Sequence, residues 1–277
     1  MPRKSYRVSF PGGNGFQLAG IVDRPSDRPS DRPDGQPDGE PNPSQRPPCL
    51  VFSHCFTCNK DLKAIVRISR ALAESGIAVL RFDMTGLGGS DGDFSLTNFS
   101  TNQSDLKSAI AFAESELGPV ATLMGHSFGG AASLAVASEM DSLSSVVTLA
   151  APSDTVHLAH LLSRMNPEIE KAGQGTVTIG GIDWQIRREM LEDFRTHDLP
   201  EKISRINARV LIFHSPTDAT VGYDHALRIA GLIQGSESAT SPASLVTLHD
   251  ADHLLASRNE DLIYVANSTA AFVHRYA

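Results

Sequence analysis

The sequence predicts an α/β fold whose core is a mostly parallel, doubly wound sheet with helices on both faces. Short apolar segments of strand length alternate along the chain with longer segments whose apolar residues recur at helical spacing. Glycine or proline separates several of these segments. Strands that alternate with helices form parallel sheets covered on both faces. We expect residues 1–277 to form a single domain, since this length suits one large α/β unit.

The predicted elements follow one another in a regular order. Residues 6–10 and 17–22 are expected to pair as an antiparallel hairpin, because a glycine-rich turn at residues 12–15 joins them. Further strands are predicted at residues 49–53, 77–82, 120–124, 146–150, 210–213 and 244–248. Helices are predicted at residues 61–75, 98–117, 127–140 and 259–276.

Residues 24–48 differ in composition from the rest of the chain. The segment opens with an Arg-Pro-Ser-Asp repeat and holds half of the 16 prolines, but it has no aliphatic or aromatic residue. Such a segment cannot bury enough apolar surface to offset the entropy lost on ordering. We predict a disordered proline-rich insertion between two strands, in preference to a proline-rich docking motif.

Residues 153–205 interrupt the alternation of strands and helices. The segment lies between two core strands and is too long for one crossover helix, so we predict a cap over the C-terminal edge of the sheet. Within it, Gly180-Gly181 predicts the turn of a hairpin. Trp184, the single tryptophan of the chain, follows this turn. We predict that Trp184 binds substrate as an aromatic wall, the alternative being that it packs the cap onto the core.

Composition excludes several classes of partner. The formal net charge of -8 argues against nucleic acid, which would require a basic face. No apolar run has the length of a transmembrane helix, and no apolar signal region follows the N-terminus, so we expect no membrane association. The three cysteines do not form the pattern of a disulfide framework. We therefore expect a reducing, cytoplasmic location.

The segment Gly-His-Ser-Phe-Gly at residues 125–129 is the strongest functional signal. It follows a predicted strand and begins an alanine-rich predicted helix, which is the context of a nucleophile elbow. In such a turn Ser127 adopts a strained conformation, and glycine two positions away on each side avoids clashes. The helix N-terminus favours negative charge developing beside the serine. A chance match in a glycine-containing loop is the alternative.

A serine nucleophile requires a base and an acid that orients the base. In this type of fold the chain order is serine, acid, histidine. Asp218 follows the predicted strand at residues 210–213, and His253 follows the strand at residues 244–248. We predict Ser127, Asp218 and His253 as the catalytic residues. Asp250 and Asp252 are rival acids, but they lie close to His253 in sequence.

The backbone N–H of Phe128 is expected to be one donor of an oxyanion hole, with the second donor in the loop after residues 49–53. That loop reads His-Cys-Phe-Thr-Cys-Asn-Lys at residues 54–60, and residues 83–92 read Asp-Met-Thr-Gly-Leu-Gly-Gly-Ser-Asp-Gly. With the elbow, these motifs resemble the α/β-hydrolase superfamily, in particular its bacterial cinnamoyl/feruloyl-esterase-like group. That group typically has His-Gly-Phe-Thr-Gly-x-Lys in this loop. The resemblance implies that the N–H of Phe56 is the second donor.

The chain departs from this group where Cys55 and Cys58 replace the two glycines. This version resembles hydrolase domains associated with OsmC-like peroxide-reductase proteins, which implies a possible OsmC-like partner. Both cysteines are expected to border the substrate pocket. They are interpreted as small residues in glycine-like positions, with a redox-sensitive thiol pair and a metal site as alternatives.

These features together predict a serine hydrolase that cleaves a small-molecule carboxylic ester or related acyl substrate through an acyl-enzyme, without a cofactor or metal. A thioesterase, peptidase, lactonase or C–C bond hydrolase of the same fold remains an alternative, as does a redox partner or a purely structural module. The glycine-rich residues 86–90 are expected to be structural, because they lack the lysine of a phosphate-binding loop.

Overall fold

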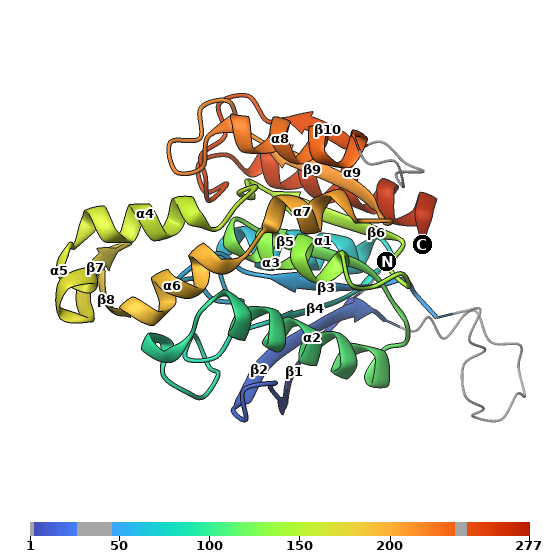
Figure 1. The fold of residues 1–277 in the computed structure, drawn as a ribbon. Helices are drawn as coiled ribbons and strands as arrows, with labels where there is room; N and C mark the ends of the chain where they lie inside the picture. The colour runs from blue at the N-terminus through green and yellow to red at the C-terminus, as the bar shows by residue number, and fades with distance from the viewer. Residues whose placement is uncertain (1–2, 27–45, 236–242) are drawn as a thin grey trace, which may run out of the picture.

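An eight-stranded sheet with the order β1-β2-β4-β3-β5-β6-β9-β10 organises the protein (Figure 1). The computed structural model describes residues 3–26, 46–235 and 243–277. In this sheet the six strands β4, β3, β5, β6, β9 and β10 run parallel to their neighbours. Strand β2 pairs antiparallel with both β1 and β4. The predicted α/β class, with a mostly parallel sheet, is confirmed.

The strands of this sheet are β1 (Arg3–Pro11), β2 (Gln17–Pro25), β3 (Cys49–Ser53), β4 (Ala78–Phe82), β5 (Val120–His126), β6 (Ser145–Leu149), β9 (Arg209–His214) and β10 (Ser244–Thr247). The helices that pack on it are α1 (Lys63–Glu74), α2 (Phe99–Glu116), α3 (Phe128–Ala137), α8 (Tyr223–Gln234) and α9 (Asn259–Tyr276). A short 3-10 helix, η3 (Phe94–Leu96), precedes α2.

Helices cover both faces of the sheet and enclose two apolar cores. Helices α1 and α9 pack together on one face, and α2, α3 and α8 lie on the other (Figure 1). Successive side chains of a strand point to opposite faces. Accordingly Val51 of β3 belongs to one core, whereas Leu50 and Phe52 belong to the other. Burial on both faces explains why the central strands are continuous apolar runs.

Local sequence signals account for several element boundaries. Helix α2 begins with a capping box, in which the Asn98 side chain accepts from the N–H of Thr101 and the Thr101 side chain accepts from the N–H of Asn98. Strand β2 continues to Pro25, so the strand predicted to end at residue 22 is longer than expected. Most of the predicted insertion at residues 24–48 lies outside the described residues. Helix α8 was not predicted from the sequence.

Residues 156–204, here called the inserted segment, hold four helices and a hairpin between β6 and β9. The elements are α4 (Val156–Met165), α5 (Glu168–Ala172), β7 (Gln174–Ile179), β8 (Ile182–Arg187), α6 (Arg188–Thr196) and α7 (Leu199–Ser204). Strands β7 and β8 turn at Gly180 and Gly181, both with positive φ, as the glycine pair predicts. Helices α4 to α6 and the hairpin project together at one side of the molecule, on the left in Figure 1.

Within the described part of the chain, no helix is both long and apolar enough to cross a membrane.

Candidate active site

Ser127 lies in the tight turn between β5 and α3. Its backbone has φ 52° and ψ -119°, a region that residues with a Cβ rarely adopt. The Ser127 N–H donates to the carbonyl oxygen of Leu149 on β6 at 2.7 Å, and its own carbonyl accepts from the N–H of Gly130 and Ala131 as α3 begins. The fold therefore holds this serine in a strained conformation at the helix N-terminus, which is common at functional sites.

Close backbone contacts explain the glycines of this turn. A Cβ on Gly125 would lie 2.2 Å from the carbonyl oxygen of Gly129. A Cβ on Gly129 would lie 2.4 Å from the carbonyl oxygen of His54 and 2.5 Å from that of Ser53. Since these contacts are with backbone atoms, a side chain could not be accommodated by a change of rotamer. The Gly-x-Ser-x-Gly pattern is thus a packing requirement of the turn.

The structure brings Ser127, His253 and Asp218 into one hydrogen-bonded chain. His253 Nε2 lies 3.0 Å from Ser127 Oγ, and His253 Nδ1 lies 2.7 Å from Asp218 Oδ2. An ionised Asp218 accepts from Nδ1–H, which leaves Nε2 as an acceptor for the serine hydroxyl. The residues come from the ends of β5, β9 and β10, because parallel strands present their C-terminal ends at one edge of the sheet.

Asp218 is held as a carboxylate by its surroundings. Burial favours the neutral acid, but the hydrogen bond and charge of His253 and the N–H groups of Val221 and Thr220 outweigh it and lower the pKa of Asp218. The two N–H groups donate to Oδ1 at 3.0 and 2.8 Å, so Oδ2 remains for His253. The carboxylate is therefore both oriented and charged where it meets the imidazole.

The rival acids do not contact the imidazole of His253. Asp252 accepts backbone N–H donations from Leu254, Ala256 and Ser257, and so closes the loop that follows His253. Asp250 is exposed, with φ 61°. Among the described residues, Asp218 is the only carboxylate with a hydrogen bond to His253.

Phe56 and Phe128 lie beside Ser127. Both line the same cavity as Ser127 and His253, and their rings pack edge to face with centroids 5.5 Å apart. No hydrogen bond within the described part of the chain uses the backbone N–H of either residue. Their rings also contact Phe194 of α6, at 6.2 and 5.3 Å, which ties the two residues to the inserted segment.

Cys55 and Cys58 form a disulfide, a bond the sequence analysis did not anticipate. The cysteines lie in the β3–α1 loop, residues 54–62, in a turn closed by a hydrogen bond from the Cys58 N–H to the Cys55 carbonyl oxygen. Thr57, inside this turn, has φ 59°. Both cysteines line the cavity beside Ser127. Among the described residues, no cluster of side chains suited to a metal ion is found.

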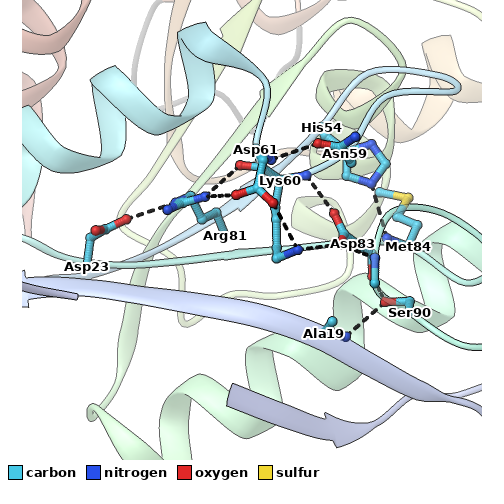
Figure 2. Close-up of polar contacts among 11 residues, drawn as sticks. Ala19, Asp23, His54, Asn59, Lys60, Asp61, Arg81, Asp83, Met84 and Ser90 are labelled. Carbon is cyan, nitrogen blue, oxygen red and sulfur yellow. Dashed lines mark hydrogen bonds and ion pairs between the residues drawn. The ribbon is translucent and has the colours of Figure 1, made fainter. Parts of the chain in front are cut away.

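A network of charged residues, all buried or largely buried except Asp61, joins the end of the same loop to β2 and β4 (Figure 2). Asp83 accepts from the backbone N–H of Lys60 at 2.6 Å and from Lys60 Nζ at 2.7 Å. Arg81 donates to the carbonyl oxygen of Lys60 and to Asp61 Oδ1, and its Nε donates to Asp23 on β2 at 2.9 Å. Paired and hydrogen-bonded charges of this kind hold a single arrangement, because breaking one leaves the other buried alone.

Three buried histidines that the sequence pattern did not single out hold backbone carbonyl groups near the hydrogen-bonded chain of Ser127, His253 and Asp218. His126 Nε2 donates to the carbonyl oxygen of His253 at 2.7 Å, and His214 Nε2 donates to that of Val221 at 2.8 Å. His54 donates from Nδ1 to the carbonyl oxygen of Cys55 and accepts from the N–H of Met84. Burial lowers the pKa of all three, that of His126 to about 4. They are therefore neutral supports at pH 7.

The cavity above Ser127 has a volume of about 550 Å³. The inserted segment supplies an apolar wall, formed by Leu158, Leu161, Met165, Ile179 and Ile182. Trp184 is not part of this cavity; the prediction that it forms a wall for the substrate is corrected. Its ring instead packs edge-on against Phe94 at 4.8 Å. Ile182 and Trp184 share one face of the hairpin, but Trp184 pairs with Val177, two residues farther from the turn than Ile182, and there it packs on Phe94.

Comparisons with known proteins give the same assignment of fold. A sequence profile of the family described as serine aminopeptidase, S33, matches residues 50–264. The esterase domain of a protein from Rhodothermus marinus is 36% identical, with a TM-score of 0.73, and the match covers 100% of this chain and 99% of that one. A search of curated protein sequences found no match.

Two more distant structures share the fold. Est1E from Butyrivibrio proteoclasticus, solved with ferulic acid bound, is 20% identical with a TM-score of 0.77, and the match covers 97% of this chain and 99% of Est1E. A serine hydrolase from Xanthomonas campestris that is described as lacking a lid is 19% identical with a TM-score of 0.61, and the match covers 99% of this chain and 96% of that one.

Proposed function

The chain belongs to the serine aminopeptidase S33 family of α/β hydrolases, and on that premise we propose that it hydrolyses carboxylic esters with Ser127 as nucleophile. The observation that carries the proposal is the hydrogen-bonded chain Ser127–His253–Asp218, whose serine and histidine line an apolar cavity. A hydroxyl, a base and an orienting acid in this geometry can form and break an acyl-enzyme.

His253 moves the proton at each step. Its Nε2 accepts the proton of Ser127 as Oγ attacks the ester carbonyl carbon, and the imidazolium that forms is stabilised by ionised Asp218. The same proton then goes to the departing alkoxide. A water takes the place of the alcohol, gives its proton to Nε2 and attacks the acyl-enzyme, which releases the acid and restores the serine.

The backbone N–H groups of Phe56 and Phe128 are the proposed donors to the oxyanion. Both residues line the cavity beside Ser127, and neither N–H has a hydrogen-bond partner among the described residues. Donors that are held in place before the reaction stabilise the charge that develops on the carbonyl oxygen. Phe128 is the first residue of α3, so the helix dipole adds to the same effect.

The cavity favours neutral, apolar substrates. Of the described residues that line it, none is an aspartate, glutamate, lysine or arginine, and the inserted segment contributes aliphatic and methionine side chains. An aminopeptidase must bind the ammonium group of its substrate, for which a nearby carboxylate is the usual partner. We therefore propose an ester with an apolar acyl or aryl group as substrate, in preference to a peptide with a free N-terminus.

A substrate panel with a serine variant tests this function. p-Nitrophenyl esters of increasing acyl length and aminoacyl p-nitroanilides are supplied to the purified chain. We expect hydrolysis of the esters with kcat/KM well above that for the anilides, and loss of it in Ser127→Ala. Ser138→Ala at the end of the same helix is the control and should keep the activity. Anilide cleavage that exceeds ester cleavage would favour the peptidase.

The OsmC-like partner and the cytoplasmic location stay predictions from the sequence. The partner would be tested by co-purification with an OsmC-like protein of the same organism. The location would be tested by fractionating cells that express the chain with a tag.

A further inference from the structure

The Cys55–Cys58 disulfide encloses the residue that we propose as the second oxyanion donor. The turn between the two sulfurs holds only Phe56 and Thr57. Thr57 directly follows Phe56 and has a φ of 59°, which a β-branched residue rarely adopts. A covalent link across so short a turn limits the backbone conformations that are open to Phe56.

The two ends of the β3–α1 loop are fixed independently of the disulfide. At one end His54 is buried and bonded to the N–H of Met84. At the other end the backbone N–H of Lys60 donates to Asp83, and its carbonyl accepts from Arg81 (Figure 2). Opening the disulfide would therefore leave the loop in place and affect mainly the turn at Phe56 and Thr57.

Reagents can reach the disulfide from the cavity. Cys58 is partly exposed, and both cysteines line the cavity that holds Ser127. The third cysteine differs, because Cys49 is fully buried in β3 and burial raises the pKa of its thiol to about 12. An added thiol is therefore expected to react at Cys55–Cys58, in the cavity beside Ser127, and not at Cys49.

From these contacts we propose that Cys55–Cys58 is a thiol–disulfide exchange site that controls the hydrolase. The disulfide form is the active form, and a small thiol that enters the cavity lowers kcat by loosening the backbone turn that positions the Phe56 N–H, while the Phe56 ring stays packed on Phe128 and Phe194. This proposal rests on the proposed function, because its output is the activity of Ser127. Reducing conditions would then lower the activity and oxidising conditions would raise it.

The exchange is a two-electron step with a thiol as reductant. A thiolate attacks Cys58 Sγ and forms a mixed disulfide, while Cys55 leaves as a thiolate and takes up a proton. A second thiol, as thiolate, attacks the sulfur of the first, so Cys58 leaves and is protonated, and the small-molecule disulfide is released. Oxidation by a small-molecule disulfide runs the same steps in reverse.

The test compares kcat of the two redox forms. The chain is prepared oxidised and, separately, reduced with dithiothreitol, and the state is verified by mass spectrometry after alkylation. With a p-nitrophenyl ester we expect reduction to lower kcat at least about tenfold, up to the roughly 10²–10³-fold that loss of one oxyanion donor causes. KM should change little, since the oxyanion forms only in the transition state. Re-oxidation should restore kcat.

Variants separate this site from other effects of dithiothreitol. Cys55→Ser/Cys58→Ser should have the kcat of the reduced form and no response to dithiothreitol. Cys55→Gly/Cys58→Gly, which restores the glycines of the resembling esterase group, is the second variant and should also lack the response. Cys49→Ala is the control and should keep the full response. A response that persists in either double variant would overturn the proposal.

The outcomes also distinguish this inference from the proposed function. Equal kcat values for verified oxidised and reduced forms would contradict the exchange control and leave the ester hydrolase intact. If neither form hydrolysed an ester and neither was labelled at Ser127 by a fluorophosphonate, the proposed function would be contradicted. The proposed regulation by thiol–disulfide exchange would then fail as well.

Discussion

His126 donates a hydrogen bond from Nε2 to the backbone carbonyl oxygen of His253 across 2.7 Å. His126 ends β5 and directly precedes Ser127, so the residue beside the proposed nucleophile holds the backbone of the proposed base. Its ring is fully buried, and its Nδ1 has no partner among the described residues. The distance between Ser127 Oγ and His253 Nε2 thus depends on a neutral histidine that does not itself touch the substrate cavity.

Replacing His126 should reveal a positioning role. We expect His126→Ala to lower kcat about 10- to 100-fold with little change in KM, because small misplacements of a base cost this much. His126→Gln can place an amide N–H near the position of Nε2, so it should recover most of the loss. The measurement is kcat and KM on a p-nitrophenyl ester. A variant that loses thermal stability but keeps the kcat of its folded fraction would indicate a purely structural role.

Acid should destabilise the fold through the same residue. The pKa of His126 is about 4 in the folded chain and 6.5 in the unfolded chain, so between these values the unfolded state binds more protons. Burial of neutral His126 makes its full contribution to the free energy of unfolding above pH 6.5. This contribution, roughly 3 kcal/mol at most, is lost as the pH falls toward 4. Urea unfolding at pH 7 and pH 4.5 measures it, and His126→Gln should show a smaller pH dependence.

Asp218 and Asp250 form a matched pair for testing the acid. Asp218→Asn removes the charge that stabilises the His253 imidazolium and can reverse its tautomer, so we expect kcat to fall about 10⁴-fold. Asp250→Asn is the control, since Asp250 is exposed and asparagine tolerates its φ of 61°. Steady-state kinetics on one ester compares them. Equal losses in both variants would contradict the role of Asp218.

Gly129 should tolerate no side chain. The Cβ of Gly129→Ala would press on the carbonyl oxygens of Ser53 and His54, and we expect a loss of at least about 1–3 kcal/mol in the free energy of unfolding. Gly231→Ala in α8 is the control, because its Cβ would meet nothing within 4 Å. Alanine is the better helix former by about 1 kcal/mol, so this control should be more stable than wild type in chemical denaturation.

Much of the fold followed from the sequence, because parallel strands buried on both faces are continuous apolar runs with little ambiguity. The residues of the hydrogen-bonded chain could also be predicted, since Ser127, Asp218 and His253 each follow a strand and parallel strands end at one edge. Helix α8 was missed, although Ala226, Ile229 and Ile233 recur on its buried side.

Other features of the site depend on geometry that residue types do not encode. His126 and His214 act through backbone carbonyl groups, which every residue has, so no spacing in the sequence marks their partners. The Cys55–Cys58 bond depends on how the turn brings two side chains together, and Cys-x-x-Cys is equally compatible with free thiols or a metal. Trp184 shares a hairpin face with Ile182, which lines the cavity, but it lies farther from the turn and packs on Phe94, a contact that no spacing in the sequence marks.

The acyl-enzyme on Ser127 is the central claim, and peptide mass spectrometry after acid quenching tests it most directly. The oxidised chain is mixed with p-nitrophenyl acetate, quenched in acid within the first turnovers, and digested. We predict an acetyl group on the peptide that contains Ser127, its disappearance as substrate is exhausted, and its absence in Ser127→Ala. Rapid ester hydrolysis with no adduct on Ser127, or with the adduct on another residue, would contradict the account.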